Sequence, residues 1–178
     1  CVGKGAFVVV VYDILWEKME LVLPDEEERR TAILEEMLYF ADINPFNIYV
    51  TKTILDPSNK YKLYFYTGNS LELDVREHFG FDKFDIIVGN PPYTTSQSIH
   101  SRVSVPLYDK FISKYIDLCD NFVFVIPARW FVTGKGIISF RNSIQMRNDI
   151  FSITYVEQSC DWFPHTDIKG GCCIIYKK

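Results

Sequence analysis

The stretch that most constrains the fold is a short apolar run that stops at two prolines. Residues 84–88 are rich in β-branched side chains and lie between turn formers, a pattern typical of a buried strand. Asn90-Pro91-Pro92-Tyr93 follows directly. Neither proline has a backbone N–H, and Pro92 keeps Pro91 extended, so the chain leaves the sheet as a stiff, non-helical segment. The sequence therefore predicts a strand that ends in a corner carrying an amide, a carbonyl and an aromatic ring.

Such a corner suits the alkylation of a planar amino group. The nitrogen of an aromatic amine or an amide is a poor nucleophile because its lone pair is delocalised into the neighbouring π-system. The Asn90 side-chain oxygen and the Pro91 carbonyl could each accept one N–H, which favours a tetrahedral nitrogen whose lone pair points at an electrophile. Tyr93 could stack on the ring that carries the amine. The plain alternative is a turn that ends a strand, with Tyr93 in the core.

Asn90-Pro91-Pro92-Tyr93 resembles the catalytic motif of the S-adenosylmethionine-dependent N6-adenine DNA methyltransferases. The surrounding sequence is similar to the branch found in restriction-modification systems, and the similarity covers nearly the whole chain. The matching stretches are residues 1–7, 41–45, 67–71, 126–130 and 163–171. The resemblance implies a doubly wound, mostly parallel, seven-stranded Rossmann-like α/β sheet with an antiparallel C-terminal hairpin. The alternation of predicted strands and helices favours the same class.

The resemblance also implies a binding site for S-adenosylmethionine. Glycines near the start of the chain let the backbone approach the methionine part, and an acidic residue that closes the second strand accepts the ribose hydroxyls. In the family, an aspartate more often stands at the position of Asn69 and contacts the cofactor adenine, where asparagine would accept through its oxygen. Ile43 is expected to pack beside that adenine. The implied cofactor residues are Gly3, Gly5, Asp42, Ile43, Asn69 and Ser70.

In the family, the first strand precedes the glycine loop. We therefore expect that strand to be missing before Cys1 and residues 1–178 to form a single catalytic domain, a fragment without a target-recognition domain. Such a truncated chain is expected to be inactive alone. The predicted strands are residues 38–41, 61–66, 84–88, 122–126, 151–156 and 172–176, and the predicted helices are residues 6–16, 24–37, 137–150 and a helix from Pro106. The valines at 8–11 favour a strand by propensity, so the helix over 6–16 rests on the resemblance.

Three loops are expected near the motif. Residues 94–105 are polar and predict a lid over the site. Residues 127–136 form a second loop at the same end of the sheet, where Arg129 or Lys135 contacts phosphate, makes a salt bridge or is simply exposed to solvent. The loop at 161–165 contains Phe163, which resembles the aromatic residue that packs against a flipped base. His165 has no metal-ligand companion at useful spacing.

Composition limits the size of the core, the cellular location and the DNA affinity that we expect for the chain. With 178 residues and 48% hydrophobic content, the chain is long enough for a substantial core. No apolar stretch has membrane-spanning length, and five cysteines without a CxxC pair indicate neither a disulfide framework nor a zinc site, so we expect a cytoplasmic protein. The net charge of −4 argues against strong DNA binding by this piece alone. Residues 94–149 carry seven basic and four acidic residues, a surplus that a solvated surface explains equally well.

The predicted function is methyl transfer from S-adenosylmethionine to N6 of an adenine flipped out of duplex DNA. The predicted catalytic residues are Asn90, Pro91, Pro92 and Tyr93, with Tyr93 and Phe163 on either side of the base. No metal and no dedicated general base are required. DNA is the expected partner, together with a restriction nuclease module or a target-recognition domain in the full-length protein, and no membrane is expected.

Two alternatives remain open. Enzymes that methylate N5 of glutamine side chains in proteins use a similar Asn-Pro-Pro-Tyr motif, because an amide poses the same lone-pair problem. They lack the tail at Gly170-Gly171 and the loop with Trp130. The chain could instead be a non-catalytic domain of a larger restriction complex.

Overall fold

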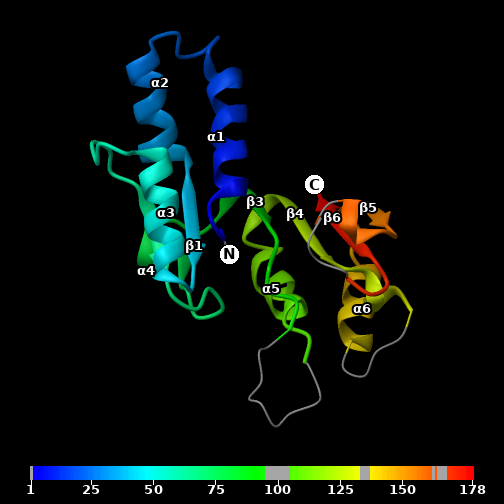
Figure 1. The fold of residues 1–178 in the computed structure, drawn as a ribbon. Helices are drawn as coiled ribbons and strands as arrows, with labels where there is room; N and C mark the ends of the chain where they lie inside the picture. Colours follow the sequence, from blue (N-terminus) through cyan, green and yellow to red (C-terminus); the bar gives the residue numbers. More distant parts are fainter. Residues whose placement is uncertain (1, 95–104, 133–136, 162, 164–167) are drawn as a thin grey trace. The chain divides into compact units, whose positions relative to one another are not determined.

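The computed structural model describes residues 2–94, 105–132, 137–161, 163 and 168–178. The chain forms two compact units, unit 1 over residues 1–81 and unit 2 over residues 82–178. Figure 1 colours the chain from blue at the N-terminus to red at the C-terminus. None of the helices in the described ranges is both long and apolar enough to span a bilayer.

Unit 1 places helices along a short parallel pair of strands (Figure 1). In that pair, Asp42 at the end of the first strand lies opposite Thr67 at the end of the second. Side chains cap two of the helices: Asp25 accepts from two backbone N–H groups, and Asn44 accepts from Phe46 N. The elements are α1 (Ala6–Met19), α2 (Glu26–Ala32), a π-helical turn η1 (Ile33–Met37), β1 (Tyr39–Asp42), α3 (Pro45–Leu55), β2 (Tyr64–Thr67) and α4 (Val75–Phe79).

Helix α1 confirms the helix predicted over residues 6–16 and extends to Met19, although it contains four consecutive valines. Gly5 begins it in the left-handed conformation, with φ of +90°. Val8 then packs into the core of unit 1, so tertiary burial outweighs the preference of valine for strands. The buried members of that core are Val2, Val8, Ile33, Leu34, Leu38, Phe40, Ile48 and Leu55.

Unit 2 is built on a four-stranded mixed sheet in the order β3-β4-β6-β5. The β3–β4 pair is parallel, whereas β6 runs antiparallel to both β4 and β5, which confirms the C-terminal antiparallel hairpin. Strand β4 is largely buried, as its composition predicts. The elements are β3 (Phe84–Gly89), α5 (Tyr108–Tyr115), β4 (Cys119–Pro127), a 3₁₀ turn η2 (Ala128–Phe131), α6 (Ile138–Gln145), β5 (Ile150–Val156), η3 (Ser159–Asp161) and β6 (Cys172–Lys177).

Two expectations for unit 2 are wrong. Strand β3 is not buried along its length, because Ile86 is 51% exposed and only Gly89 is buried. Helix α6 ends at Gln145 instead of continuing to residue 150. Arg147 follows it and bonds the carboxylates of Asp117 and Asp149, so the connection to β5 is fixed by ion pairs instead of a further helical turn.

Candidate functional site

The predicted cofactor residues of unit 1 gather around the Asp42 carboxylate at the end of β1. Its Oδ2 accepts a hydrogen bond from Gly3 N at 2.9 Å. Its Oδ1 accepts from Asn44 N at 2.9 Å and from Asn47 Nδ2 at 3.1 Å. Asp42 therefore joins the glycine loop, the end of β1 and the start of α3, and it is only 4% exposed.

The hydrogen-bonding capacity of Asp42 limits how it could bind a ribose. A carboxylate offers about four lone-pair positions, and the protein already uses three of them. One ribose hydroxyl could be accepted without disturbing the present bonds. Accepting both hydroxyls, as the sequence analysis expects, would require Gly3 or Asn47 to move away.

The glycine loop lies against both β1 and α3. Val2 N donates to Ala41 O at 2.9 Å, which places the loop beside the last residues of β1. Gly3 and Gly5 both have positive φ, at +57° and +90°. A Cβ on Gly5 would lie 3.0 Å from Thr51 Oγ1 on α3, so a larger residue would force these elements apart.

A second turn reaches the same corner from the end of β2. Gly68 N donates to Asp42 O at 3.0 Å, which brings the next residue, Asn69, to the end of β1. Asn69 Oδ1 accepts from Leu71 N at 3.1 Å, and Asn69 Nδ2 donates to Glu72 Oε1 at 2.6 Å. Sequence reasoning missed Glu72. Its spacing of three residues from Asn69 within a turn was the available signal.

The two remaining cofactor candidates differ in accessibility. Ile43 is 66% exposed directly beside the buried Asp42, so its side chain is available to an aromatic ring. Ser70 is 5% exposed and lies within the turn at the end of β2. The structure thus assembles all six predicted cofactor residues at one end of the β1–β2 pair, with Ile43 as the most accessible of them.

The predicted catalytic corner lies in unit 2, directly after β3. Gly89 lies opposite Phe124 of β4, and a Cβ on this glycine would approach the Phe124 ring to 3.0 Å. Asn90 and Tyr93 are half-buried, whereas Pro91 is buried and Pro92 is exposed. Among the residues that the structure describes, Asn90 Oδ1 and the Tyr93 hydroxyl have no hydrogen-bond partner, although both atoms are fully covered.

Burial, with smaller contributions from the nearby Cys172 and Cys173, raises the pKa of Tyr93 to about 12, while the adjacent Asn90 side chain acts in the opposite direction. The Tyr93 hydroxyl thus remains neutral throughout the physiological range. Burial also raises the pKa of Tyr108, the first residue of α5, to about 12 and that of Cys173 to about 11.

The segment after the motif returns to Tyr93. Thr94 forms an isolated antiparallel bridge with Pro106, and Leu107 N donates to Tyr93 O at 3.1 Å. These contacts tie both ends of the predicted lid to the catalytic corner. Within the lid predicted over 94–105, residues 95–104 lie outside the described part of the chain.

The other predicted site residues are only partly described. Phe163 is half-buried, and its N–H donates to Ser159 O at 2.8 Å, but its neighbours at 162 and 164–167, which include His165, lie outside the described residues. Arg129 is exposed on η2, and Lys135 also lies outside the described residues. Within the described ranges, no group of three His, Cys, Asp or Glu side chains is arranged to hold a metal ion.

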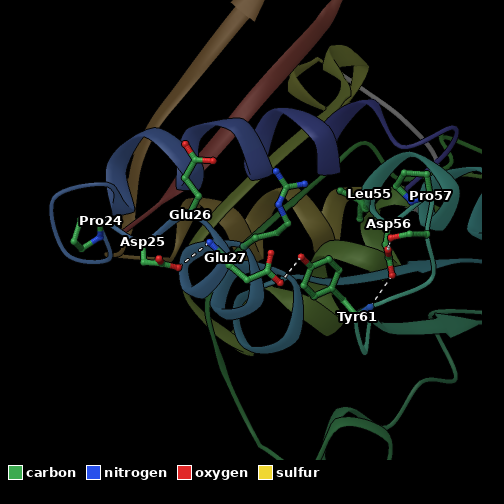
Figure 2. A pocket seen from close by; sticks show the side chains of 10 residues that line it. Pro24, Asp25, Glu26, Glu27, Leu55, Asp56, Pro57 and Tyr61 are labelled. Carbon is green, nitrogen blue, oxygen red and sulfur yellow. Dashed lines mark hydrogen bonds between the residues drawn. The ribbon is translucent and has the colours of Figure 1, made fainter.

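Unit 1 also contains a pocket of about 690 Å³ (Figure 2). It is formed by the start of α2 and the loop from α3 to β2, and it is lined by Pro24, Asp25, Glu26, Glu27, Arg30, Leu55, Asp56, Pro57, Ser58 and Tyr61. Two of its acids already have partners, since Glu27 accepts from Tyr61 Oη and Asp56 accepts from Tyr61 N. None of the predicted cofactor or catalytic residues lines it.

Comparison with known proteins identifies the family. The profile of a family described as Eco57I restriction-modification methylase matches residues 25–163. An uncharacterized adenine-specific methylase from Mycoplasma pneumoniae is 34% identical over 120 residues. That alignment covers 65% of this chain and 26% of the relative, so the chain spans about a quarter of the length of the curated relative it matches.

Solved structures share the fold of the chain. A modification subunit of a putative type I restriction enzyme from Vibrio vulnificus has a TM-score of 0.72 at 14% identity, covering 99% of this chain and 38% of that one. The M protein of the type I restriction enzyme EcoKI has a TM-score of 0.71 at 11% identity, covering 100% and 38%. A putative class I S-adenosylmethionine-dependent methyltransferase from Listeria monocytogenes has a TM-score of 0.63 at 12% identity, covering 99% and 51%. The fold is thus that of the α/β methyltransferases, and the chain belongs to the Eco57I restriction-modification methylase family.

Proposed function

We propose that this chain is the catalytic core of an S-adenosylmethionine-dependent enzyme that methylates N6 of adenine in DNA within a restriction-modification system. The observation that carries the proposal is the Asn90 side-chain oxygen, an acceptor held at the end of β3 without a partner among the described residues. A buried acceptor that the protein leaves unused is costly, so its retention favours a function. The description of the Mycoplasma relative as adenine-specific supports adenine as the target.

The corner after β3 would act by directing the amine of the target. Asn90 Oδ1 and the Pro91 carbonyl accept one N–H each, which turns the nitrogen lone pair out of the plane of the base. Proline at 92 keeps the two acceptors in a fixed relation because it restricts the backbone on either side. Tyr93 is neutral below its pKa of about 12, so it stacks on the base instead of acting as a general base. After transfer, the substituted nitrogen is acidic and loses its proton to water.

The residues of unit 1 fit the cofactor that the family implies. Asp42 has one lone-pair position left for a ribose hydroxyl, Ile43 offers an exposed apolar side chain to the adenine, and the glycine loop lies beside Asp42. Gly3, Gly5, Asp42, Ile43, Asn69 and Ser70 would hold it. When bound, S-adenosylmethionine supplies an activated methyl group.

Access to Asn90 requires a local rearrangement. Because Oδ1 is fully covered, a base reaches it only after the covering atoms move. We extend the proposal to a flipped adenine packed between Tyr93 and Phe163. We also include in it a single domain over residues 1–178, a seven-stranded sheet that lacks its first strand in this chain, a cytoplasmic location, and a nuclease or target-recognition partner in the full-length protein.

The test compares Asn90→Ala with Asn142→Ala, which removes an exposed amide from α6. Methyl transfer from labelled S-adenosylmethionine to duplex DNA is measured for the full-length protein, and cofactor binding is measured by calorimetry. We expect Asn90→Ala to lower the rate by about 100-fold or more, as for loss of one preorganised polar contact to a transition state, without loss of cofactor affinity. Asn142→Ala should match the wild type.

Full activity of Asn90→Ala would refute the proposed role of the corner. A folded protein that binds no cofactor would favour the non-catalytic alternative. Methylation of a glutamine-containing protein, with no transfer to DNA, would favour the glutamine alternative.

A further inference from the structure

The turn after β2 has a pattern of donors and acceptors that differs from the one expected for Asn69. Asn69 Oδ1 already accepts from Leu71 N, which closes a tight turn at 3.1 Å. The other atom of the amide, Nδ2, donates to Glu72 Oε1 at 2.6 Å. Glu72 N also donates to Asn69 O at 2.8 Å, so the two residues are joined through side chain and backbone. These contacts fix which way the amide faces.

An amide nitrogen cannot accept a hydrogen bond from an amino group. The Asn69 Nδ2 carries two N–H groups, and Glu72 accepts from one of them in a bond that is exposed to solvent. A donor in this place suits a ring nitrogen with a lone pair, such as N1 of adenine. An exocyclic amine needs an acceptor, and the carboxylate of Glu72 is the acceptor that lies beside the donor.

The turn is also in the right place for the base of an adenosine. Gly68 N donates to the carbonyl oxygen of Asp42, the last residue of β1, and Asn69 is the residue that follows Gly68. Ile43 is exposed beside Asp42. Consider a nucleoside whose ribose hydroxyl binds Asp42 and whose base packs on Ile43. The far edge of its base is then directed to the end of β2, the strand beside β1, where Asn69 and the exposed Glu72 lie.

We propose that Glu72 is the residue that selects adenine in the cofactor, by accepting from its 6-amino group, and that Asn69 is the positioning residue that also donates to N1. This inference rests on the proposed function. The charge-assisted bond between the two side chains keeps the carboxylate oriented before the ligand arrives.

The test uses two probes that differ at one position of the purine, S-adenosylhomocysteine and S-inosylhomocysteine. The second carries an oxygen in place of the amine, which turns a donor into an acceptor and adds a proton at N1. Affinities are measured by calorimetry for the full-length wild type, for Glu72→Gln and for Glu77→Gln, which alters an exposed carboxylate on α4 in the same unit. Glutamine at 72 can still accept from Asn69 while its amide nitrogen donates to the oxygen of inosine.

We expect the wild type to prefer the adenosyl compound by about tenfold or more, the effect of a hydrogen bond to a charged group. Glu72→Gln should lose or reverse that preference, and Glu77→Gln should keep it. If the wild type discriminates and Glu72→Gln retains the same ratio, Glu72 does not read the base and the inference fails, while the proposed cofactor site stands. If the wild type binds both compounds with equal affinity, the inference also fails and the proposed cofactor site stands. If the folded protein binds neither compound, the cofactor site itself is wrong and the inference falls with it.

Discussion

The Asp42 carboxylate organises the predicted cofactor corner of unit 1, so its removal should loosen that corner in a measurable way. Asp42→Ala leaves three donors without their acceptor: Gly3 N, Asn44 N and Asn47 Nδ2. A hydrogen bond to a charged group contributes about 1.5 to 3 kcal/mol. Asp42 itself is buried, but the three donor residues are partly exposed, so water replaces some of each bond in the variant, and we expect a total loss of about 2 to 4 kcal/mol in the free energy of unfolding.

Asp42→Asn should lose less than Asp42→Ala. Its amide oxygen can still accept at one position, but its NH₂ group would face a backbone or side-chain donor, so we expect a loss of about 1 to 2 kcal/mol. The matched control is Asp74→Ala, which removes a single bond to Glu77 N at the exposed start of α4 and should cost about 1 kcal/mol.

Two measurements check this reasoning. Urea denaturation gives the free energy of unfolding of each variant, and amide hydrogen exchange reports on the Gly3 and Asn44 N–H groups individually. In Asp42→Ala both amides should exchange at least about tenfold faster than in the wild type, in line with the loss of a bond of 1.5 kcal/mol each. An Asp42→Ala variant that is no less stable than Asp74→Ala, with unchanged exchange at Gly3, would refute the role given to this carboxylate.

Further predictions concern glycine and tyrosine residues of unit 2. Gly171→Ala should be more destabilising than Gly170→Ala by about 2 kcal/mol or more, as judged by urea denaturation. Both have positive φ, but only at Gly171 would a Cβ lie 2.3 Å from a carbonyl oxygen, that of Val156; equal losses would contradict the structure. Stability should decrease between pH 10 and 12, because Tyr93 and Tyr108 ionise near 10 when unfolded and near 12 when folded, so their contribution is complete below pH 10. Tyr93→Phe should weaken this pH dependence and leave stability at pH 7 unchanged or higher, since it removes a covered hydroxyl without a described partner; an unchanged alkaline slope would contradict the assignment.

The fold was predictable where local signals and burial agree. Asp25 and Asn44 are residue types that favour helix starts because short polar side chains satisfy free backbone N–H groups, and both cap helices in the structure. Helix α1 shows the limit of propensity, since its valines favour a strand, and the packing of Val8, Val11 and Leu15 into the core of unit 1 explains the helix. The early end of α6 was not predictable, because the ion pairs of Arg147 depend on Asp117, thirty residues away in sequence.

The candidate site was predictable as a set of positions but not as a pattern of hydrogen bonds. Strand ends placed Asp42 and Asn69 at one corner because parallel strands bring their carboxyl ends to the same edge. The Asn69 Oδ1 accepts from Leu71 N and its Nδ2 donates to Glu72, contacts that residue identity alone does not specify. The hydrogen bonds of Asp42 were not predictable either, because three of the positions at which its carboxylate can accept are used by the protein itself.

Because Thr94 and Pro106 are paired with each other, the sequence between them could change in length within this family. The bridge between these residues and the bond from Leu107 N to Tyr93 O fix the entry and exit of the chain. Doubling the length of an insertion between fixed ends costs only about 0.6 kcal/mol of closure entropy. Evolution could therefore lengthen or replace this stretch, for example with a sequence-reading insert, while the geometry of Asn90 and Tyr93 stays the same.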